Sequence, residues 1–152
     1  MKKPKILKVA QLGNPVIRQK CEPIIDIGHS EVQELIDNLI KTCDAFGGVG
    51  IAAPQVYVPV RLFIIWSRPN TRYPKAPRME PIAMINPRII RKSKRIKKDW
   101  EGCLSIPGIR ALVPRHFGIE VEYTDRKGKL YRKKFSDFVA RIFQHELDHL
   151  NG

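Results

Sequence analysis

The sequence of 152 residues lacks both a long apolar run and a secretory leader. No window approaches the roughly 20 uninterrupted apolar residues that a membrane-spanning helix needs. The basic start MetLysLysProLys leads into no apolar segment with a small-residue cleavage site. We therefore expect a protein with no membrane partner that stays in the cytoplasm.

Cysteine is scarce, with three residues at positions 21, 43 and 103. An odd number without paired spacing argues against a disulfide framework and for a reducing compartment. Cys43 continues an apolar helical pattern, so we expect it to be a small core residue. At least one thiol remains free for other chemistry.

Acidic residues are outnumbered: 15 Asp and Glu stand against 28 Lys and Arg, which gives a net charge of +13. Such an excess attracts polyanions, with nucleic acid or a ribonucleoprotein surface as the usual partners. The densest stretch, residues 88–98, carries seven basic residues. Its simpler interpretation is a solvated strand or hairpin edge whose charges oppose aggregation, and a contact surface for RNA or the ribosome is the alternative. Nothing in the sequence predicts a specific DNA site.

Repeats and low-complexity linkers are also absent, and the twelve prolines are spread along the chain. With 43% apolar residues, the chain can bury a core without help from disulfides. We therefore predict a single domain over residues 1–152.

Two segments have the apolar periodicity of helices. In the first, Ser30 and Gln33 have the spacing of a capping box, apolar residues follow at helical intervals, and a pair of glycines at 47 and 48 ends the pattern. The second segment, residues 136–150, begins with Ser136 as the expected N-cap and is apolar around most of its circumference. The second helix should therefore be buried.

Short apolar runs rich in β-branched and aromatic residues predict strands at residues 60–66 and 82–85. Residues 118–124 alternate apolar and acidic side chains, and the turn at 125–128 leads into a basic strand, which predicts a β-hairpin. Strands joined by tight turns pair antiparallel. We therefore expect an α+β fold in which antiparallel β-sheets pack around the buried helix.

The buried helix contains HisGluLeuAspHis at residues 145–149. His145 and His149 lie four residues apart, so both imidazoles lie on one helical face and reach a single metal ion. Glu146 reaches a metal-bound water without binding the metal itself. The pattern HExxH also recurs by chance, as a charged helix with surface histidines. The apolar surroundings weaken that alternative.

Two further clusters carry residues suited to a metal site. Cys103 lies in GluGlyCysLeuSer (101–105), and a thiolate is a strong third ligand, although an isolated cysteine is more commonly a small core residue. Residues 48–55, GlyValGlyIleAlaAlaProGln, have small residues that allow close backbone approach, and Gln55 adds an amide donor. A phosphate-binding loop is a weaker interpretation, because no GlyLysSer or GlyLysThr follows.

Together, the three clusters resemble the signatures of the peptide deformylases: GxGxAAxQ at residues 48–55, EGCxS at 101–105 and QHExDH at 144–149. The segment GlyAsnProValIleArg (13–18) and the intervening spacing also fit, so the resemblance covers nearly the whole chain. It implies a metal-dependent hydrolase that removes the formyl group, a linear amide, from the N-terminal formyl-methionine of newly synthesised proteins. It also implies one divalent metal ion on Cys103, His145 and His149, with water as the fourth ligand.

The resemblance assigns catalytic roles to three residues. Glu146 is the general acid and base, which takes a proton from the attacking metal-bound water and delivers it to the departing amine. The Gln55 side chain and the Leu104 backbone N–H stabilise the oxyanion together with the metal.

The resemblance also implies how substrate binds. Val49, Gly50 and Gly102 would pair with the substrate main chain as an added β-strand, which tolerates varied sequences beyond methionine. The methionine side chain would enter an apolar pocket near Val49 and the helix residues before His145.

The identity of the metal is less constrained than its ligands, because a thiolate and two imidazoles suit several ions. The resemblance implies Fe(2+) as the native ion, with Zn(2+), Ni(2+) or Co(2+) as substitutes. We also expect Glu101 and Arg115 to form a supporting ion pair, because they flank the same loop.

Many members of the family continue past the metal-binding helix, and in some of them a C-terminal helix contacts the ribosome. This sequence ends at Gly152, so that contact is not carried over, and the basic residues 88–98 are the alternative surface for ribosome contact. Two rival functions remain. One is an HExxH metallopeptidase, which usually takes a downstream third ligand, and the other is a basic RNA- or ribosome-binding module with a structural metal site.

Overall fold

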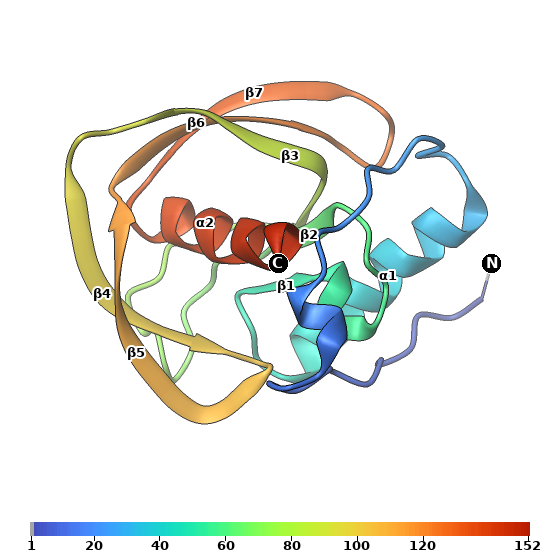
Figure 1. Ribbon diagram of the computed structural model, residues 1–152, viewed down its shortest axis with the longest axis horizontal. Helices are drawn as coiled ribbons and strands as arrows, with labels where there is room; N and C mark the ends of the chain where they lie inside the picture. Colours follow the sequence, from blue (N-terminus) through green and yellow to red (C-terminus); the bar gives the residue numbers. More distant parts are fainter. Residues whose placement is uncertain (1) are drawn as a thin grey trace.

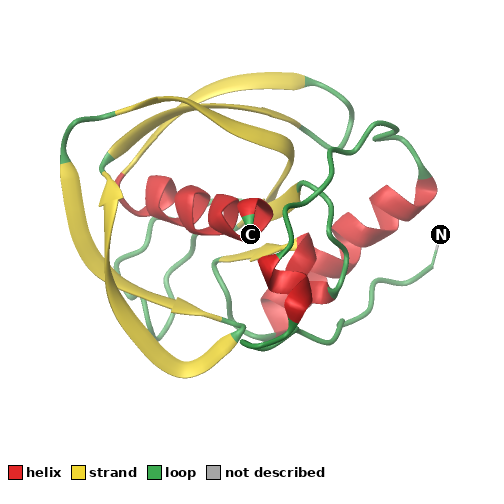
Figure 2. Ribbon diagram, in the orientation of Figure 1, coloured by secondary structure: helices red, strands yellow, loops and turns green. Residues whose placement is uncertain are grey.

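The computed structural model describes residues 2–152, which form two antiparallel sheets and two α-helices (Figures 1 and 2). One sheet has the strand order β1-β2-β3-β6-β7, and the other is a hairpin of β4 and β5. The elements are η1 (Pro15–Arg18), α1 (Ser30–Ala45), β1 (Gly50–Ala52), η2 (Ala53–Val56), β2 (Leu62–Ile65), β3 (Ile82–Lys92), β4 (Ile96–Cys103), β5 (Ile106–His116), β6 (Gly118–Thr124), β7 (Leu130–Ser136) and α2 (Asp137–Asn151). The expected α+β fold with antiparallel sheets is confirmed.

The five-stranded sheet lies between the two helices, and β2 shows why. All four residues of β2 are buried, because successive side chains point to opposite faces and both faces are covered. Leu62 and Ile64 belong to the apolar cluster that includes α1, whereas Phe63 and Ile65 pack with α2. In Figure 1, α2 runs through the middle of the molecule, with β3, β6 and β7 arching over it and β4 and β5 curving past its first turns.

Strands β6 and β7 form the predicted hairpin, with Gly118 opposite Ser136 and Thr124 opposite Leu130. Along β6, Ile119, Val121 and Tyr123 are buried against the α2 side, as their alternation with glutamates predicts. The glutamates face outward and form ion pairs with neighbouring strands. The alternating pattern therefore determined which face of this hairpin is covered.

Strand β3 is longer than the sequence indicates. The Asn86–Pro87 step resembles a strand end, yet β3 continues to Lys92. Asn86 has φ +50, and its side chain accepts from Ile24 N and donates to Ile24 O, both at 2.9 Å. Asparagine tolerates this left-handed conformation, and the pairing register with β6 shifts just after it. The end of β3, the connection and the start of β4 together contain the basic residues 88–98.

The predicted N-cap of α2 agrees with the structure, whereas that of α1 differs. Helix α1 is capped by His29, whose Nδ1 accepts from the Glu31 N–H at 3.1 Å, so Ser30 is already helical. Gln33 donates instead to the carbonyl oxygens of Ile27 and Arg126, and the predicted capping box is wrong. Ser136 does precede α2, but its side chain makes no capping hydrogen bond. Within residues 2–152, neither helix has the length and apolar character that a membrane crossing requires.

Candidate functional site

Three predicted ligands meet where the β4–β5 hairpin turns beside α2. Cys103 is the last residue of β4, next to a register shift in the hairpin, and His145 and His149 lie on successive turns of α2. The Cys103 Sγ and one ring nitrogen from each histidine all lie within 4.8 Å of one another. Cys103 Sγ is 3.4 Å from His149 Nε2. Residues 42 positions apart in the chain are thus brought to one point by the fold.

The donor set fits a divalent metal ion of borderline softness, since one thiolate and two imidazoles are ligands that such ions prefer. A tetrahedral ion with typical bond lengths holds a sulfur and a nitrogen ligand about 3.6 Å apart. The Sγ to Nε2 distance of 3.4 Å is close to that value. The Cys103 and His149 donors therefore already lie at a distance that suits such an ion, and the His145 donor lies within 4.8 Å of both.

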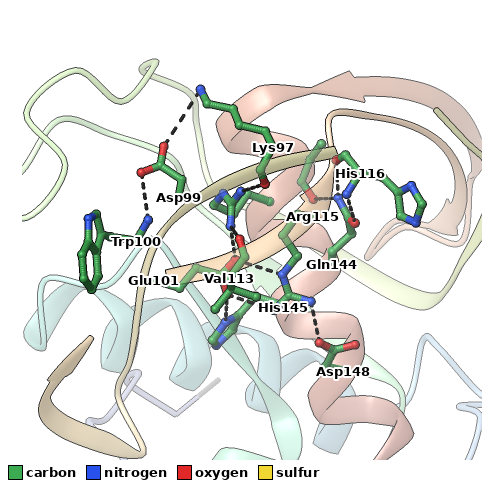
Figure 3. Close-up of polar contacts among 12 residues, drawn as sticks. Lys97, Asp99, Trp100, Glu101, Val113, Arg115, His116, Gln144, His145 and Asp148 are labelled. Carbon is green, nitrogen blue, oxygen red and sulfur yellow. Dashed lines mark hydrogen bonds and ion pairs between the residues drawn. The ribbon is translucent and has the colours of Figure 1, made fainter. Parts of the chain in front are cut away.

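Glu101 lies behind His145 and connects the hairpin to α2 (Figure 3). Its Oε1 is 2.9 Å from His145 Nδ1, so the other ring nitrogen faces Cys103. Arg115 donates to both carboxylate oxygens at 2.9 Å, and Arg141 donates to Oε2 at 2.6 Å. Burial favours the neutral acid, but the hydrogen bonds from Arg115 and His145 outweigh it and lower the pKa of Glu101 to about 2. The predicted pair of Glu101 and Arg115 is confirmed.

The sequence analysis did not predict that Asp148 and Arg141 belong to this network. Arg115 also donates to Asp148 at 2.6 Å, which ties β5 to the last turns of α2 (Figure 3). Arg141 is 5% exposed and donates to the backbone oxygens of Val113 and Lys97, besides Glu101. A charged residue among the apolar positions of a buried helix requires polar partners. This rule would have identified Arg141 from the sequence.

The pKa values of the two histidines are shifted in opposite directions. Burial, followed by the charges of His145 and Arg115, lowers the pKa of His149 to about 3. Burial also disfavours charge on His145, but the neighbouring Cys103 and Glu101 outweigh it and raise the pKa of His145. The protein therefore keeps His149 neutral, as a metal ligand must be.

Glu146 is almost completely buried, at 4% exposure, and its carboxylate lies against β1. A Cβ at Gly50 would lie 2.9 Å from both Glu146 Oε1 and Ile142 Cγ2, so only glycine leaves room for this carboxylate. Burial raises the pKa of Glu146 to about 7. Among residues 2–152, Glu146 Oε2 has no hydrogen-bond partner. An unpaired buried carboxylate oxygen is unusual, and a catalytic role accounts for such a group.

Gln55 lies in η2 with its amide held in one orientation. Its Oε1 accepts from the Ala52 N–H at 2.9 Å, and its Nε2 donates to Ser105 Oγ at 3.1 Å and Cys103 Sγ at 3.5 Å. The side chain is 2% exposed. The amide donor therefore faces the thiol, and Ser105, which has no role in the sequence-based prediction, helps to hold it.

A cavity beside Cys103 collects nearly all of the predicted site residues. Its walls include eight of them: Val49, Gly50, Gln55, Gly102, Cys103, Leu104, His145 and Glu146. His149 is not part of this wall and lines a neighbouring cavity, which shares Cys103 and His145 with the first. The wall also includes Arg72, Tyr73, Phe138 and Ile142, together with Gly47, Gly48, Glu101 and Arg141. Among these residues, Arg72 and Tyr73 come from the β2–β3 loop (residues 66–81), where no sequence motif indicates a function.

The sequence of the chain matches one family model along almost its full length. The model is described as polypeptide deformylase and matches residues 6–152. Peptide deformylase 2 from Nostoc sp. is 60% identical over 149 residues, which cover 98% of this chain and 83% of the relative. Peptide deformylase 2 from Shewanella oneidensis is 42% identical over 148 residues, which cover 97% of this chain and 81% of the relative.

The fold is also similar to solved structures. A class I type b peptide deformylase from Acinetobacter baumannii with bound Met-Ala-Ser has a TM-score of 0.94 and 40% identity, covering 97% of this chain and 94% of that chain. A peptide deformylase from Thermotoga maritima has a TM-score of 0.86 and 31% identity, covering 97% and 92%. Sequence and fold thus agree on the same group of relatives.

Proposed function

Because the chain belongs to the polypeptide deformylase family, we propose that it removes the formyl group of formyl-methionine through a metal held by Cys103, His145 and His149. Members of this family are metal-dependent hydrolases that deformylate the N-terminal methionine of newly made proteins. The observation that carries the proposal is the convergence of one thiol and two imidazoles beside a buried glutamate. An ordinary HExxH metallopeptidase is disfavoured, because the third donor, Cys103, precedes the helix.

The chemistry separates into what a metal supplies and what the protein supplies. A divalent ion on these ligands would lower the pKa of water and polarise a carbonyl group. Glu146 holds the proton that is removed from the attacking water and returns it to the departing amine. Its pKa of about 7 suits both steps, because a group near the operating pH both accepts and donates protons readily.

Gln55 and Leu104 are the proposed donors to the formyl oxygen. The Gln55 amide is already oriented by the Ala52 N–H, so no side-chain freedom is lost when it donates to a developing negative charge. The Leu104 backbone follows the cysteine directly and lines the same cavity. Loss of one such donor raises the barrier by roughly 3 kcal/mol in comparable enzymes.

Substrate main chain would bind along β1 and the end of β4. Strand β1 is at the edge of the five-stranded sheet and pairs only with β2, so Val49 and Gly50 border an edge open to an added strand. Gly102 lies across the cavity from them. The methionine side chain would contact Val49, Phe138 and Ile142, three of the apolar side chains of the cavity wall.

The proposal also covers the catalytic domain, the native metal ion and the place where the reaction occurs. Residues 1–152 would act as one catalytic domain with the metal motif on the buried helix α2, and Fe(2+) would be the native ion, with Zn(2+), Ni(2+) or Co(2+) as substitutes. Because its substrate would be a formylated nascent chain, the enzyme would act in the cytoplasm. The basic residues 88–98 would contribute electrostatic attraction to the ribosome.

The test is turnover of a formyl-Met peptide against the matching acetyl-Met peptide, together with metal analysis. Wild type should hydrolyse only the formyl peptide and contain about one metal ion per chain. Glu146→Ala should retain metal and lose turnover, and Cys103→Ser should lose both. A metal-loaded wild type that leaves the formyl peptide intact would overturn the proposal.

A further inference from the structure

The cavity at Cys103 continues into a second cavity along the β4–β5 hairpin. The two share Arg72, Gly102, Cys103 and Leu104. The second cavity adds the N-terminal segment and the hairpin turn, and no Asp or Glu lines it. Its charged side chains are Lys8, Arg72 and Arg110. Substrate residues that follow the methionine would therefore enter a cationic groove.

Arg72 and Arg110 flank Gly102, immediately before the proposed metal ligand. A Cβ at Gly102 would lie 3.6 Å from Arg72 Nη1 and 3.9 Å from Arg110 Cγ. Both arginines also line a third cavity, which borders the first through Tyr73, Phe138 and Arg141. A chain that leaves the first cavity through either neighbouring cavity therefore passes these two guanidinium groups, although Asp99 and Asp137 also line the third cavity and only the second is free of carboxylates.

Neither guanidinium group is neutralised by the protein. In the part of the chain that the structure describes, 2–152, neither Arg72 nor Arg110 forms an ion pair with a carboxylate, whereas Arg115 and Arg141 both do. Arg110 lies over the ring of Tyr73, with its Cζ 5.2 Å from the ring centroid. The Tyr73 hydroxyl accepts from the Gly102 N–H at 3.1 Å, and its ring packs on Phe138. Tyr73 therefore fixes the loop and holds Arg110 beside Gly102, with its N–H groups free.

We propose that Arg72 and Arg110 select formyl-methionyl chains with a carboxylate at the second or third residue. A planar guanidinium group binds a carboxylate through paired hydrogen bonds, and two of them lie beside the main-chain path. An extended chain advances about 3.5 Å per residue, so a side chain one or two residues past methionine lies near Gly102. This specificity rests on the proposed deformylase function.

The experiment compares peptides that differ only in charge. Formyl-Met-Glu-Ala and formyl-Met-Ala-Glu are tested against their Gln counterparts, all with amidated C-termini so that no other carboxylate is present. Wild type should have a kcat/KM roughly 3- to 10-fold higher for a Glu peptide, mostly through KM, because exposed ion pairs are weak and two act together. High salt should shrink this ratio.

Variants of the two arginines test whether the groove causes the difference in kcat/KM between Glu and Gln peptides. In Arg72→Gln/Arg110→Gln, the Glu-to-Gln ratio should fall to about one, and in Arg72→Glu/Arg110→Glu, Lys peptides should be preferred over Gln peptides. The control Lys127→Gln/Lys134→Gln removes two exposed charges outside these cavities and should keep the wild-type ratio. A wild type that deformylates Glu and Gln peptides equally overturns the specificity and leaves the function intact. Failure on every formyl peptide overturns the function itself.

Discussion

Arginine and glutamate meet in two settings in this protein, one inside and one on the surface. Behind the metal-ligand cluster, Glu101 is 8% exposed and receives hydrogen bonds from two arginines and a histidine. On the outer face of β6, Glu122 pairs with Arg88 and Glu120 with Arg132, and both arginines are more than half exposed. The residue types are the same, but water reaches the arginines of the second set far more than those of the first, although Glu122 and Glu120 are themselves only 24% and 15% exposed.

The buried and the exposed ion pairs contribute differently to stability and to the position of their side chains. An exposed pair gains little, because water solvates both partners almost as well as they solvate each other. A buried carboxylate has no such substitute, so every one of its partners is needed and its position is fixed. The buried set therefore orients a histidine beside Cys103, whereas the surface set is replaceable.

Thiol reactivity should show the largest contrast between interior and cavity wall. Burial raises the pKa of Cys43 to about 12, against an ordinary value near 9. At pH 8 its thiolate fraction is therefore roughly 1000-fold lower than that of an unperturbed thiol. After metal removal, iodoacetamide should label Cys103, which lines the cavity, and spare Cys43, as read by mass spectrometry of tryptic peptides. Equal labelling of both thiols in folded protein would contradict the assignment.

Glu101→Gln should be the most destabilising exchange among the ion pairs. The amide keeps the shape but leaves buried Arg141 without a counter-charge and Arg115 with only the exposed Asp148, which costs roughly 3 kcal/mol in unfolding free energy. Urea denaturation measures this loss. Metal content should fall as well, because His145 loses its orienting partner. If the variant were as stable as wild type, Glu101 would contribute no more to the unfolding free energy than the surface pairs do, which would contradict the prediction.

Gly50→Ala tests the close approach of β1 to α2. The new methyl group would lie 2.9 Å from Glu146 Oε1 and Ile142 Cγ2, and such overpacking costs about 1 to 3 kcal/mol. Turnover should fall further than stability does, because the displaced group is the proposed acid and base. Gly48→Ala is the matched control, since its methyl group meets Cys43 Sγ and Leu104 Cδ1 at 3.4 Å. Equal effects at the two positions would count against a specific role for Gly50.

The surface pairs should give the smallest effect. Arg88→Gln and Glu122→Gln, singly and together, should each change unfolding free energy by less than about 0.5 kcal/mol. A double-mutant cycle in urea denaturation isolates the coupling between the two residues. A coupling as large as that of Glu101 with Arg115 would remove the distinction between the two settings.

Local patterns predicted much of this molecule. The alternation in residues 118–124 identified the hairpin and its buried face, and the spacing of His145 and His149 placed both on one side of α2. The long-range features were harder. The continuation of β3 depends on Asn86 binding the backbone of Ile24, which lies 62 residues away. No local rule reports such a partner.

Within the candidate site, the sequence provided residue types and the fold provided their neighbours. The Glu101–Arg115 pair was predicted, whereas Arg141 and Asp148 were not, because their partners come from other elements. Arg72 and Tyr73 belong to a loop without regular structure, and only their contacts at Gly102 connect them to the site.

The amino-acid sequence alone defines which side chains can bind a metal or move a proton. It also defines their spacing along each helix or strand, because covalent geometry and helical periodicity are local. Tertiary structure decided what surrounds them. It buried Glu146 beside Gly50, turned the Gln55 amide toward Cys103 and placed Arg72 and Arg110, which have no carboxylate partner within residues 2–152, beside Gly102. Desolvation and hydrogen bonding act through space, so the chemical character of these groups exists only once distant segments have packed together.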